Sequence, residues 1–500
     1  MSSPAHLAID LGASSGRAIV GVLAGSPLKL QLEEVHRFEH SPCPTPTGPV
    51  WNLTGIWQHI LTGLRAGAAW CKENDAELQS VGVDTWGVDW TLLGASGELL
   101  ALPHCYRDPA NDAACERVLE ELGGFEPLYE RTGIQLMPLN TIFQLAARHA
   151  AEPRLFDAAS RLVFLPDLFH YWLSGELSCE RTIASTSSLL AVESGEWDTS
   201  LIEQLGLPSE LFAPLIEPGT KLGTLRAEIA KETGTAANVQ VVLPASHDTG
   251  SAIAAVPAVG DASWGYLSSG TWSLLGVERD TPVYSTAARE APFTNERGAQ
   301  RTIRLLKNIA GLWLIQELKR DLEKEGQQAS FAHLVKEAEA AEPGRTIINP
   351  DRAEFAAPGD MRAKIRQFAL ETKQEVPETT GQYARCCLES LALCYGRTIG
   401  QLEGVLGESL DVLHIVGGGI QNTLLNRMAA EVVSKPVVTG PVEATAVGNL
   451  MVQAMGCGEV GNLSEVRQTV ARSFDLETIE PTQTARWEPF RDRFVELVSA

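Results

Sequence analysis

The residues best placed for chemistry lie in the stretch VVLPASHDTGSA, residues 241–252. Its apolar start is typical of a buried strand, and Pro244 ends that strand. His247, Asp248 and Thr249 follow at once, and open α/β sheets bind their ligands beyond the carboxyl ends of strands. A carboxylate placed there can accept a proton from a substrate hydroxyl, so Asp248 is a candidate general base. The alternative is that Asp248 only caps the helix that follows.

A second candidate site is a hydroxyl-rich turn between apolar strands expected over residues 7–11 and 18–23. The turn consists of Gly12, Ala13, Ser14, Ser15, Gly16 and Arg17. Strand, tight turn and strand form a hairpin, unlike the strand-to-helix turn of a Walker A or dinucleotide site. Its N–H groups and hydroxyls can surround a phosphate, and Asp10 beside it then implies Mg²⁺ held through water. The alternative is an ordinary surface turn.

The segment DTWGVDW, residues 84–90, follows a short strand expected over residues 81–83. Two acids and two tryptophans around a glycine suit the binding of a polyol, because indoles pack on sugar faces and carboxylates bind hydroxyls. Gly87 lets the backbone approach such a ligand closely. The alternative is a tryptophan pair in the core with aspartates in turns.

The second half of the chain repeats the logic of the first hairpin. Strands are expected over residues 264–267 and 272–277, and the turn between them is Ser268-Ser269-Gly270-Thr271. Two such hairpins, one in each half, predict two related domains that hold one phosphate chain from opposite sides. This repeat is more specific than either turn alone.

Two further stretches are candidates for nucleotide binding. Residues 304–317 are expected to run into a helix, which places Asn308 and Gln316 about 12 Å apart along its axis. The alternative there is a core-packing helix with two incidental amides. Three glycines, including Gly418, follow a strand expected over residues 412–416, so a base or a phosphate can lie directly on the backbone.

Length and composition indicate a two-domain globular protein. A chain of 500 residues exceeds the size at which single cores stop growing, about 250–300 residues. Its hydrophobic content of 44% and charged content of 21% are ordinary for a globular protein. The net charge of −23 without a basic cluster argues against nucleic acid or an anionic membrane surface as partner. A polyanionic substrate must therefore be held by local donors.

No targeting segment or membrane-spanning stretch is expected. The start, MSSPAHLAIDLG, leads directly into a strand, and no stretch approaches about 18 consecutive apolar residues. Nine scattered cysteines form no CxxC pair and no metal-ligand spacing with histidine, so free thiols in a reducing cytoplasm are expected.

Five stretches stand in one order along the chain: DLGASSGR, DTWGVDW, ASHDTGSA, SSGTWSLLG and GGGIQN. Together they resemble the FGGY carbohydrate kinases, and KNIAGLWLIQE, DTWGVDW and HDT resemble the rhamnulokinase branch in particular. The resemblance spans roughly residues 8–455. It implies an α/β fold of two actin-like (ribonuclease H-like) domains with a central cleft. Residues 1–245 would form the N-terminal domain with the sugar site and the first hairpin, and residues 246–500 the nucleotide-binding C-terminal domain.

The resemblance also implies an activity and a role for each candidate residue. The reaction would be transfer of the ATP γ-phosphoryl group to the 1-hydroxyl of L-rhamnulose, with Asp248 as the base. The sugar would contact Gly87, His247, Asp248 and Thr249; the nucleotide would contact residues 13–17, Thr271, Asn308, Gln316 and Gly418. Two departures stand out. Ala13 replaces a threonine of many members, and the pattern after the glycines is degenerate at Thr423 and Arg427.

Two other functions stay open. One is a kinase for another ketose, such as L-fuculose or L-xylulose, because a few hydroxyl contacts determine which sugar binds. The other is a non-catalytic actin-like ATP-binding protein, which has no need of DTWGVDW or of an acid at Asp248. The expected partners are ATP with Mg²⁺ and a small ketose, and the expected assembly is a monomer or a small homo-oligomer.

Overall fold

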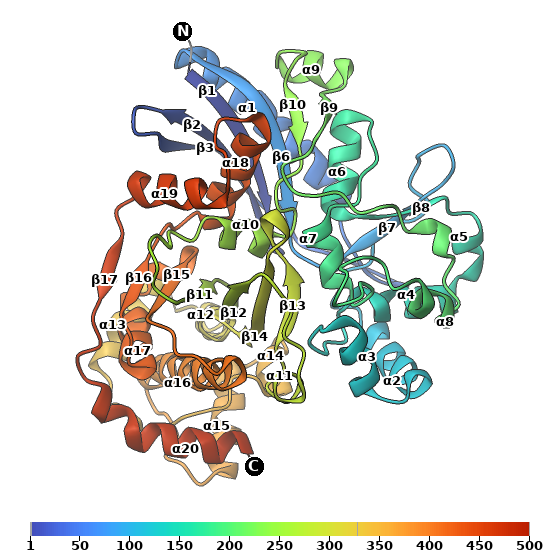
Figure 1. Ribbon diagram of the computed structural model, residues 1–500. Helices are drawn as coiled ribbons and strands as arrows, with labels where there is room; N and C mark the ends of the chain where they lie inside the picture. The colour runs from blue at the N-terminus through green and yellow to red at the C-terminus, as the bar shows by residue number, and fades with distance from the viewer. Residues whose placement is uncertain (1–2, 328, 500) are drawn as a thin grey trace. The chain divides into compact units, whose positions relative to one another are not determined.

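The computed structural model describes residues 3–327 and 329–499, which form two compact units (Figure 1). The first unit runs through Pro257 and adds Glu278–Leu305 and Ala444–Ser473. The second comprises Ala258–Val277, Leu306–Glu443 and the residues from Phe474 onward. Each unit therefore draws on more than one segment of the chain. The expected domain limits, 1–245 and 246–500, stay a prediction.

The first unit is built on a six-stranded mixed sheet with the order β3-β2-β1-β6-β10-β9. The strands are β1 (Ser3–Leu11), β2 (Ser15–Ala24), β3 (Lys29–Glu39), β6 (Ala76–Thr85), β9 (Lys221–Thr224) and β10 (Gln240–Val242). β1 is antiparallel to β2, whereas β1, β6 and β10 run parallel to one another. The carboxyl ends of these three parallel strands therefore meet at one edge of the sheet. Asp248 is expected from the sequence to lie at such an edge.

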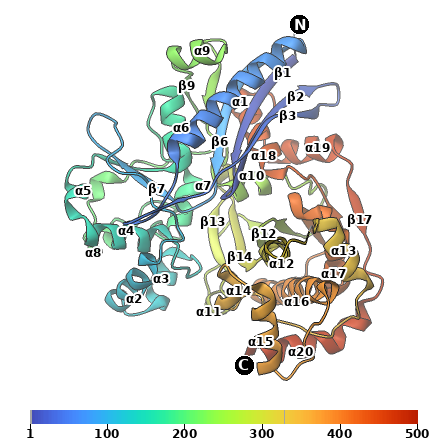
Figure 2. The ribbon, with the colours of Figure 1, turned by 180° about the vertical axis from the view of Figure 1, so that it is seen from behind.

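Helices cover both faces of this sheet. α1 (Leu53–Glu73) begins at the Asn52 cap, whose side chain accepts the N–H of Gly55, and a Cβ on Gly63 of α1 would contact Ala18 of β2. α18 (Ala444–Cys457) comes from late in the sequence, and its Leu450 packs over Gly21 on the other face of β2. Figure 1 shows α18 across one face and Figure 2 shows α1 across the other. Small residues at these contacts let the helices approach the strands closely.

The rest of the first unit is mainly helical. Its helices are α2 (Ala110–Leu122), α3 (Phe125–Thr132), α4 (Thr141–Ala151), α5 (Pro153–Asp157), α6 (Leu165–Ser174), α7 (Arg181–Ala184), α8 (Thr199–Gln204), α9 (Ala227–Thr233), α10 (Asp248–Ala254), α11 (Thr286–Glu290) and α19 (Leu463–Ser473). Its short elements are β4 (Cys43–Thr45), β5 (Gly48–Val50), β7 (Trp90–Leu93), β8 (Arg161–Phe164), β13 (Thr294–Arg297), η1 (Ser185–Ser187), η2 (Ser209–Leu211) and η3 (Ala299–Arg301). None of the helices formed by residues 3–327 and 329–499 combines the length and apolar character needed to cross a membrane.

The second unit contains a sheet with the order β14-β12-β11-β15-β16-β17. The strands are β11 (Trp264–Ser269), β12 (Trp272–Arg279), β14 (Ile303–Ala310), β15 (Val412–Val416), β16 (Val437–Thr439) and β17 (Glu477–Ile479). The start of β14, residues 303–305, belongs to the first unit. The long helix α16 (Thr380–Leu406) is tied to β12 by a 2.7 Å bond between the Tyr395 and Ser273 hydroxyls. The remaining elements are α12 (Trp313–Lys324), α13 (Phe331–Ala340), α14 (Ala353–Ala356), α15 (Met361–Glu371), α17 (Thr423–Val433), α20 (Glu488–Ser499), η4 (Gly418–Gln421) and η5 (Thr484–Trp487).

The expectation of a helix from residue 304 is wrong for its first half. Residues 303–310 form β14, and the helix α12 begins only at Trp313, beyond Gly311. A Cβ on Gly311 would overlap the backbone of Thr271 and Trp272, so this loop folds tightly onto the β11–β12 turn. An apolar run that is buried on both faces fits a strand as well as a helix, which explains the error.

The close packing of α18 on α10 gives a test of the fold. A Cβ on Gly448 of α18 would overlap the carbonyl oxygen of Ser251 in α10. We expect Gly448→Ala to destabilise the first unit by about 1–3 kcal/mol or more, because the helices must separate. Gly400→Ala is the matched control: Gly400 lies inside α16 with open space around it, so alanine should stabilise that helix by about 1 kcal/mol. Melting temperatures that fall equally in both variants would contradict this packing.

Candidate active site

The first predicted hairpin is confirmed. Asp10 pairs with Arg17 and Leu11 with Gly16 across the antiparallel strands β1 and β2. The turn closes through a 2.9 Å bond from the Gly12 N–H to the Ser15 carbonyl. Nε2 of His40 lies 2.8 Å from the Gly12 carbonyl and supports the turn from the side. The Arg17 guanidinium lies 3.5 Å from the carboxylate of buried Asp10, so the carboxylate partly neutralises the positive charge of Arg17.

Three carboxyl groups gather where β1, β6 and β10 end. Asp84 is completely buried at the end of β6, and its pairing partner across the sheet is Asp10. Burial, reinforced by the negative charges of Asp10 and Asp248, raises the pKa of Asp84 well above its ordinary value. Asn449 of α18 donates to Asp84 at 2.5 Å. The edge of the sheet is therefore acidic.

Asp248 is the first residue of α10, and its side chain is 28% exposed. Oδ1 accepts the Thr249 N–H at 2.6 Å and the Thr249 hydroxyl at 3.2 Å. Nε2 of His247 lies 3.3 Å from the same oxygen. These local contacts all use Oδ1, and Oδ2 accepts no hydrogen bond from the described residues. Asp248 is thus not the N-cap residue of α10, which is His247, and its carboxylate leaves one oxygen available for a ligand.

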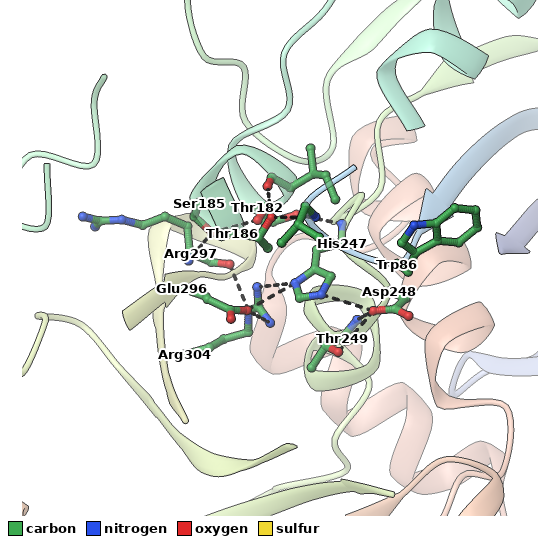
Figure 3. Close-up of polar contacts among 12 residues, drawn as sticks. Trp86, Thr182, Ser185, Thr186, His247, Asp248, Thr249, Glu296, Arg297 and Arg304 are labelled. Carbon is green, nitrogen blue, oxygen red and sulfur yellow. Dashed lines mark hydrogen bonds and ion pairs between the residues drawn. The ribbon is translucent and has the colours of Figure 1, made fainter. Parts of the chain in front are cut away.

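His247 lies at the centre of a polar cluster, with Asp248 on one side and a buried pair, Glu296 and Arg304, on the other (Figure 3). The backbone N–H of His247 is also held, at 3.2 Å, by the Thr182 hydroxyl. Glu296 and Arg304 are not among the residues predicted from the sequence. An arginine inside the apolar strand Ile303–Ala310 was the available signal, because a buried charge needs a buried partner.

Gly87 lies against His247, as expected for two residues of one site. A Cβ on Gly87 would lie 3.3 Å from Nε2 of His247. The next residue, Val88, has a left-handed backbone with φ of +68°, which costs a β-branched residue about 1–3 kcal/mol. Its N–H donates to the Thr186 hydroxyl at 3.0 Å, and its carbonyl accepts the Thr141 hydroxyl at 2.6 Å. The surrounding side chains thus enforce a strained turn beside His247.

The two tryptophans of DTWGVDW lie in different cores. Trp86 stacks on Trp51 with ring centroids 4.2 Å apart, whereas Trp90 packs near Phe156. Asp89 is buried and accepts both indole N–H groups, from Trp51 at 2.6 Å and from Trp86 at 2.8 Å. Of the pair, Trp86 is the one that lies on the Asp248 side of the cluster in Figure 3. Both tryptophans are therefore core residues, and Trp86 is the one whose core borders the cluster around His247 and Asp248.

The second unit contains the other predicted hairpin, also confirmed, with Ser269 opposite Ser273 across β11 and β12. In this turn the Gly270 carbonyl accepts a hydrogen bond from the Leu312 N–H at 3.0 Å, so the turn lies against the start of α12. Thr271 there lies 3.4 Å from the Gln316 amide nitrogen.

The glycine run after β15 lies beside the same turn. Gly417 has a φ of +89°, and a Cβ on Gly419 would overlap Ser269. Gly418, between them, has open space where a side chain would be. Asn308 lies on β14 and not on a helix, so the predicted helical spacing from Gln316 is wrong, although both residues flank the Gly311 loop.

Comparison with known families matches nearly the whole chain. Residues 5–255 match the N-terminal domain of the FGGY family of carbohydrate kinases, and residues 265–457 match its C-terminal domain. The chain belongs to the FGGY family of carbohydrate kinases. Kinases of this family use ATP as the phosphoryl donor, so the chain is an ATP-dependent carbohydrate kinase.

Individual FGGY kinases are similar over their full length. A rhamnulokinase of Bacteroides thetaiotaomicron is 42% identical over 481 residues, which covers 96% of this chain and 96% of that protein. A rhamnulokinase of Bacillus subtilis is 39% identical over 481 residues with the same coverage.

Solved FGGY kinase structures confirm the predicted actin-like α/β fold. The crystal structure of a gluconate kinase from Lactobacillus acidophilus matches with a TM-score of 0.80 at 16% identity, covering 100% of this chain and 98% of that one. A glycerol kinase from Plasmodium falciparum, crystallised with ADP, matches with a TM-score of 0.76 at 15% identity, with 100% and 98% covered.

The burial of Asp89 in this FGGY kinase predicts an optical titration. Burial raises the pKa of Asp89 from 3.8 to about 7. Below that pH the carboxyl group gains a proton and binds the indoles of Trp51 and Trp86 less strongly; above it the group is charged. We expect tryptophan fluorescence to change with a midpoint near pH 7, and the change to shrink in Trp86→Phe. Trp172→Phe is the control, because Trp172 packs on Trp57 and should leave the amplitude intact. A midpoint near 3.8 would contradict the assignment.

Proposed function

We propose that the chain is a rhamnulokinase, which transfers the γ-phosphoryl group of ATP to the 1-hydroxyl of L-rhamnulose. The observation that carries this proposal is the partly exposed Asp248 at the carboxyl end of β10, with one carboxylate oxygen free and Gly87, His247 and Thr249 around it. The choice of sugar is supported by the relatives, two of which, named rhamnulokinases, are 42% and 39% identical over nearly the whole chain.

In the proposed reaction Asp248 acts as the general base. The sugar hydroxyl oxygen forms a bond to the γ-phosphorus as the bond from that phosphorus to the ADP oxygen breaks, and the hydroxyl proton passes to Asp248. Phosphoryl transfer has a loose transition state, so orienting the hydroxyl matters more than basicity. An ordinary carboxylate is then sufficient. Oδ2 is the oxygen suited to this task, because Oδ1 is already bonded to Thr249.

We assign the other contacts by the same reasoning. Gly87, His247 and Thr249 would bind the sugar, since they surround Asp248. The turn of residues 13–17 would bind phosphate through its N–H groups and hydroxyls. In the second unit Thr271, Asn308, Gln316 and Gly418 would contact the nucleotide; support comes from the shared location of Thr271 and Gln316 and from the open backbone at Gly418.

Mg²⁺ would accompany ATP and be held, through water, by Asp10. The oxygen donors at the ends of β1 and β6 fit this hard cation. Within residues 3–327 and 329–499, no three histidine, cysteine or acidic side chains converge to enclose a metal ion directly. That arrangement is compatible with a cation that enters with the nucleotide and supplies charge neutralisation. Cytoplasmic location and a monomeric or small homo-oligomeric state also stay predictions.

A screen of ketoses tests the substrate. With ATP and Mg²⁺ present, we expect coupled ADP release to be fastest with L-rhamnulose. It should be slower with L-fuculose, which differs in hydroxyl stereochemistry, and with L-xylulose, which has one carbon fewer. The product should carry its phosphate on the 1-oxygen, as phosphorus NMR will show. A higher kcat/KM with another ketose would show that L-rhamnulose is not the preferred substrate, but the chain would still be a ketose kinase. Sugar-independent ATP binding without turnover would instead indicate a non-catalytic protein.

Replacement of the proposed base tests the mechanism. Asp248→Asn preserves the side-chain shape and an oxygen for the Thr249 N–H, but it removes the proton acceptor. We expect turnover of L-rhamnulose to fall at least about 10²-fold, with the melting temperature nearly unchanged. Asp261→Asn, which alters an exposed aspartate, is the matched control and should retain full turnover. Near-normal turnover by Asp248→Asn would remove this residue from the role of base.

A further inference from the structure

A buried row of three charged or titratable side chains ends at Asp248 (Figure 3). Arg304 on β14 is fully buried, and its Nη1 lies 3.1 Å from the carboxylate of Glu296 on β13. Nε of Arg304 donates to the Arg297 carbonyl at 2.9 Å, which fixes the plane of the guanidinium. Nη2 then lies 3.1 Å from Nδ1 of His247. The other ring nitrogen of His247, Nε2, faces Asp248 at 3.3 Å.

The Glu296–Arg304 pair is ionised. A guanidinium removed from water is strongly destabilising unless a carboxylate lies close to it. Burial raises the pKa of Glu296, but the charge of Arg304 is the largest opposing effect, and the pKa lies below its ordinary value. Glu296 is therefore an anion, and the pair adds no net charge beside His247. An arginine side chain has N–H donors only and does not lose its proton in proteins.

This geometry selects one form of the His247 ring. Because Nη2 of Arg304 can only donate, a bond to Nδ1 requires a lone pair on that nitrogen. The single hydrogen of the neutral ring is then on Nε2 and points toward Asp248. Glu296 also lies 3.3 Å from Nδ1 and alone would favour a hydrogen there. Arg304 is the closer partner, and its positive charge opposes an imidazolium.

We propose that Arg304 is a positioning residue that holds His247 neutral, with its hydrogen on Nε2, so that His247 orients Asp248 without neutralising its charge. A protonated His247 would form an ion pair with Asp248 and weaken it as a proton acceptor. A ring with its hydrogen on Nδ1 would instead turn the lone pair of Nε2 toward the Asp248 carboxylate, and the hydrogen bond that orients this carboxylate would be lost. This inference rests on the proposed function only in its consequence for turnover; the state of the ring does not depend on the substrate.

Other charged groups near His247 do not replace Arg304. Arg297 directs its guanidinium to the carbonyl of Val192 and faces away. Buried Glu180 caps α7 and bonds the Ser246 N–H. The surrounding elements also carry Asp84 at the end of β6 and Arg181 on α7, which pairs with Glu196 and Glu217. Glu77 lies near the start of β6, and Lys307 of β14 pairs with Asp351.

The first test reads the ring directly in the wild-type protein. Histidine labelled with ¹⁵N distinguishes a protonated ring nitrogen from a bare one, and the His247 signals among the ten histidines are assigned by their loss in His247→Asn. We expect the neutral ring with hydrogen on Nε2 at neutral pH, with or without sugar. An imidazolium or an Nδ1–H ring at neutral pH would overturn the proposal, whatever the substrate proves to be.

The second test uses the pH dependence of turnover. In Arg304→Met, His247 lies between the carboxylates of Glu296 and Asp248 without an opposing charge, so it gains a proton more readily. We expect the acid limb of the kcat profile to move up by roughly one pH unit or more, the size of effect that a close opposite charge produces. A role confined to folding would lower the melting temperature or the amount of active protein but would not move this limb.

Two further variants make the kinetic test specific. Glu296→Gln retains the bond from Arg304 to Nδ1, so its acid limb should not move up, even where kcat falls. His247→Asn/Arg304→Met has no ring to protonate, so its acid limb should match that of His247→Asn. An upward shift in Glu296→Gln, or a shift that persists in the double variant, would overturn the proposal. If Arg304→Met does not fold, the ¹⁵N measurement on the wild type decides alone.

Discussion

The structure of the site depends on one buried carboxylate, that of Glu180. Glu180 accepts the N–H of Thr182 at 2.8 Å, its hydroxyl at 2.6 Å and, from beyond β10, the N–H of Ser246 at 3.1 Å. Thr182 in turn accepts the N–H of His247. A carboxylate out of water is tolerated only with such donors, and its burial raises the pKa of Glu180 to about 7. This bond network connects α7 to the residue before His247 and thereby determines where Asp248 begins its helix.

The same unit is completed by a helix from the far end of the sequence. Gln453 of α18 donates to the Leu7 carbonyl of β1 at 3.0 Å and accepts the Ser80 hydroxyl of β6 at 2.6 Å. Asn449, one turn earlier, bonds Asp84. Because amides buried in a core need partners, these two side chains determine how α18 lies on the sheet. The small buried residues of α18, among them Ala446 and Gly448, allow close packing, but no local feature of the sequence indicates which sheet the helix covers.

The sequence predicts the parts of the site that depend on local chemistry. Both hairpins and the position of Asp248 past a strand follow from glycine, hydroxyl and apolar patterns within about a dozen residues, and the structure has them. The errors occur where distant residues decide. Asn308 is on a strand because both faces of residues 303–310 are buried, and Trp90 belongs to another core than Trp86. Glu180 and Arg304 form their contacts only after folding brings four segments together, so no spacing along the chain indicates them.

Three locally unfavourable features surround the dipeptide His247–Asp248. Val88 has a left-handed backbone, Arg304 is a fully buried charged side chain, and Glu180 is a buried acid. Each persists only because several neighbours hold it, and each contributes to holding the residues next to it. These three features lower the stability of the fold, but they leave the dipeptide little conformational freedom. A base in phosphoryl transfer needs orientation more than strength, so a rigid carboxylate is what that reaction requires. The strain around Asp248 is therefore explained by its proposed role better than by helix capping, for which a single hydrogen bond suffices.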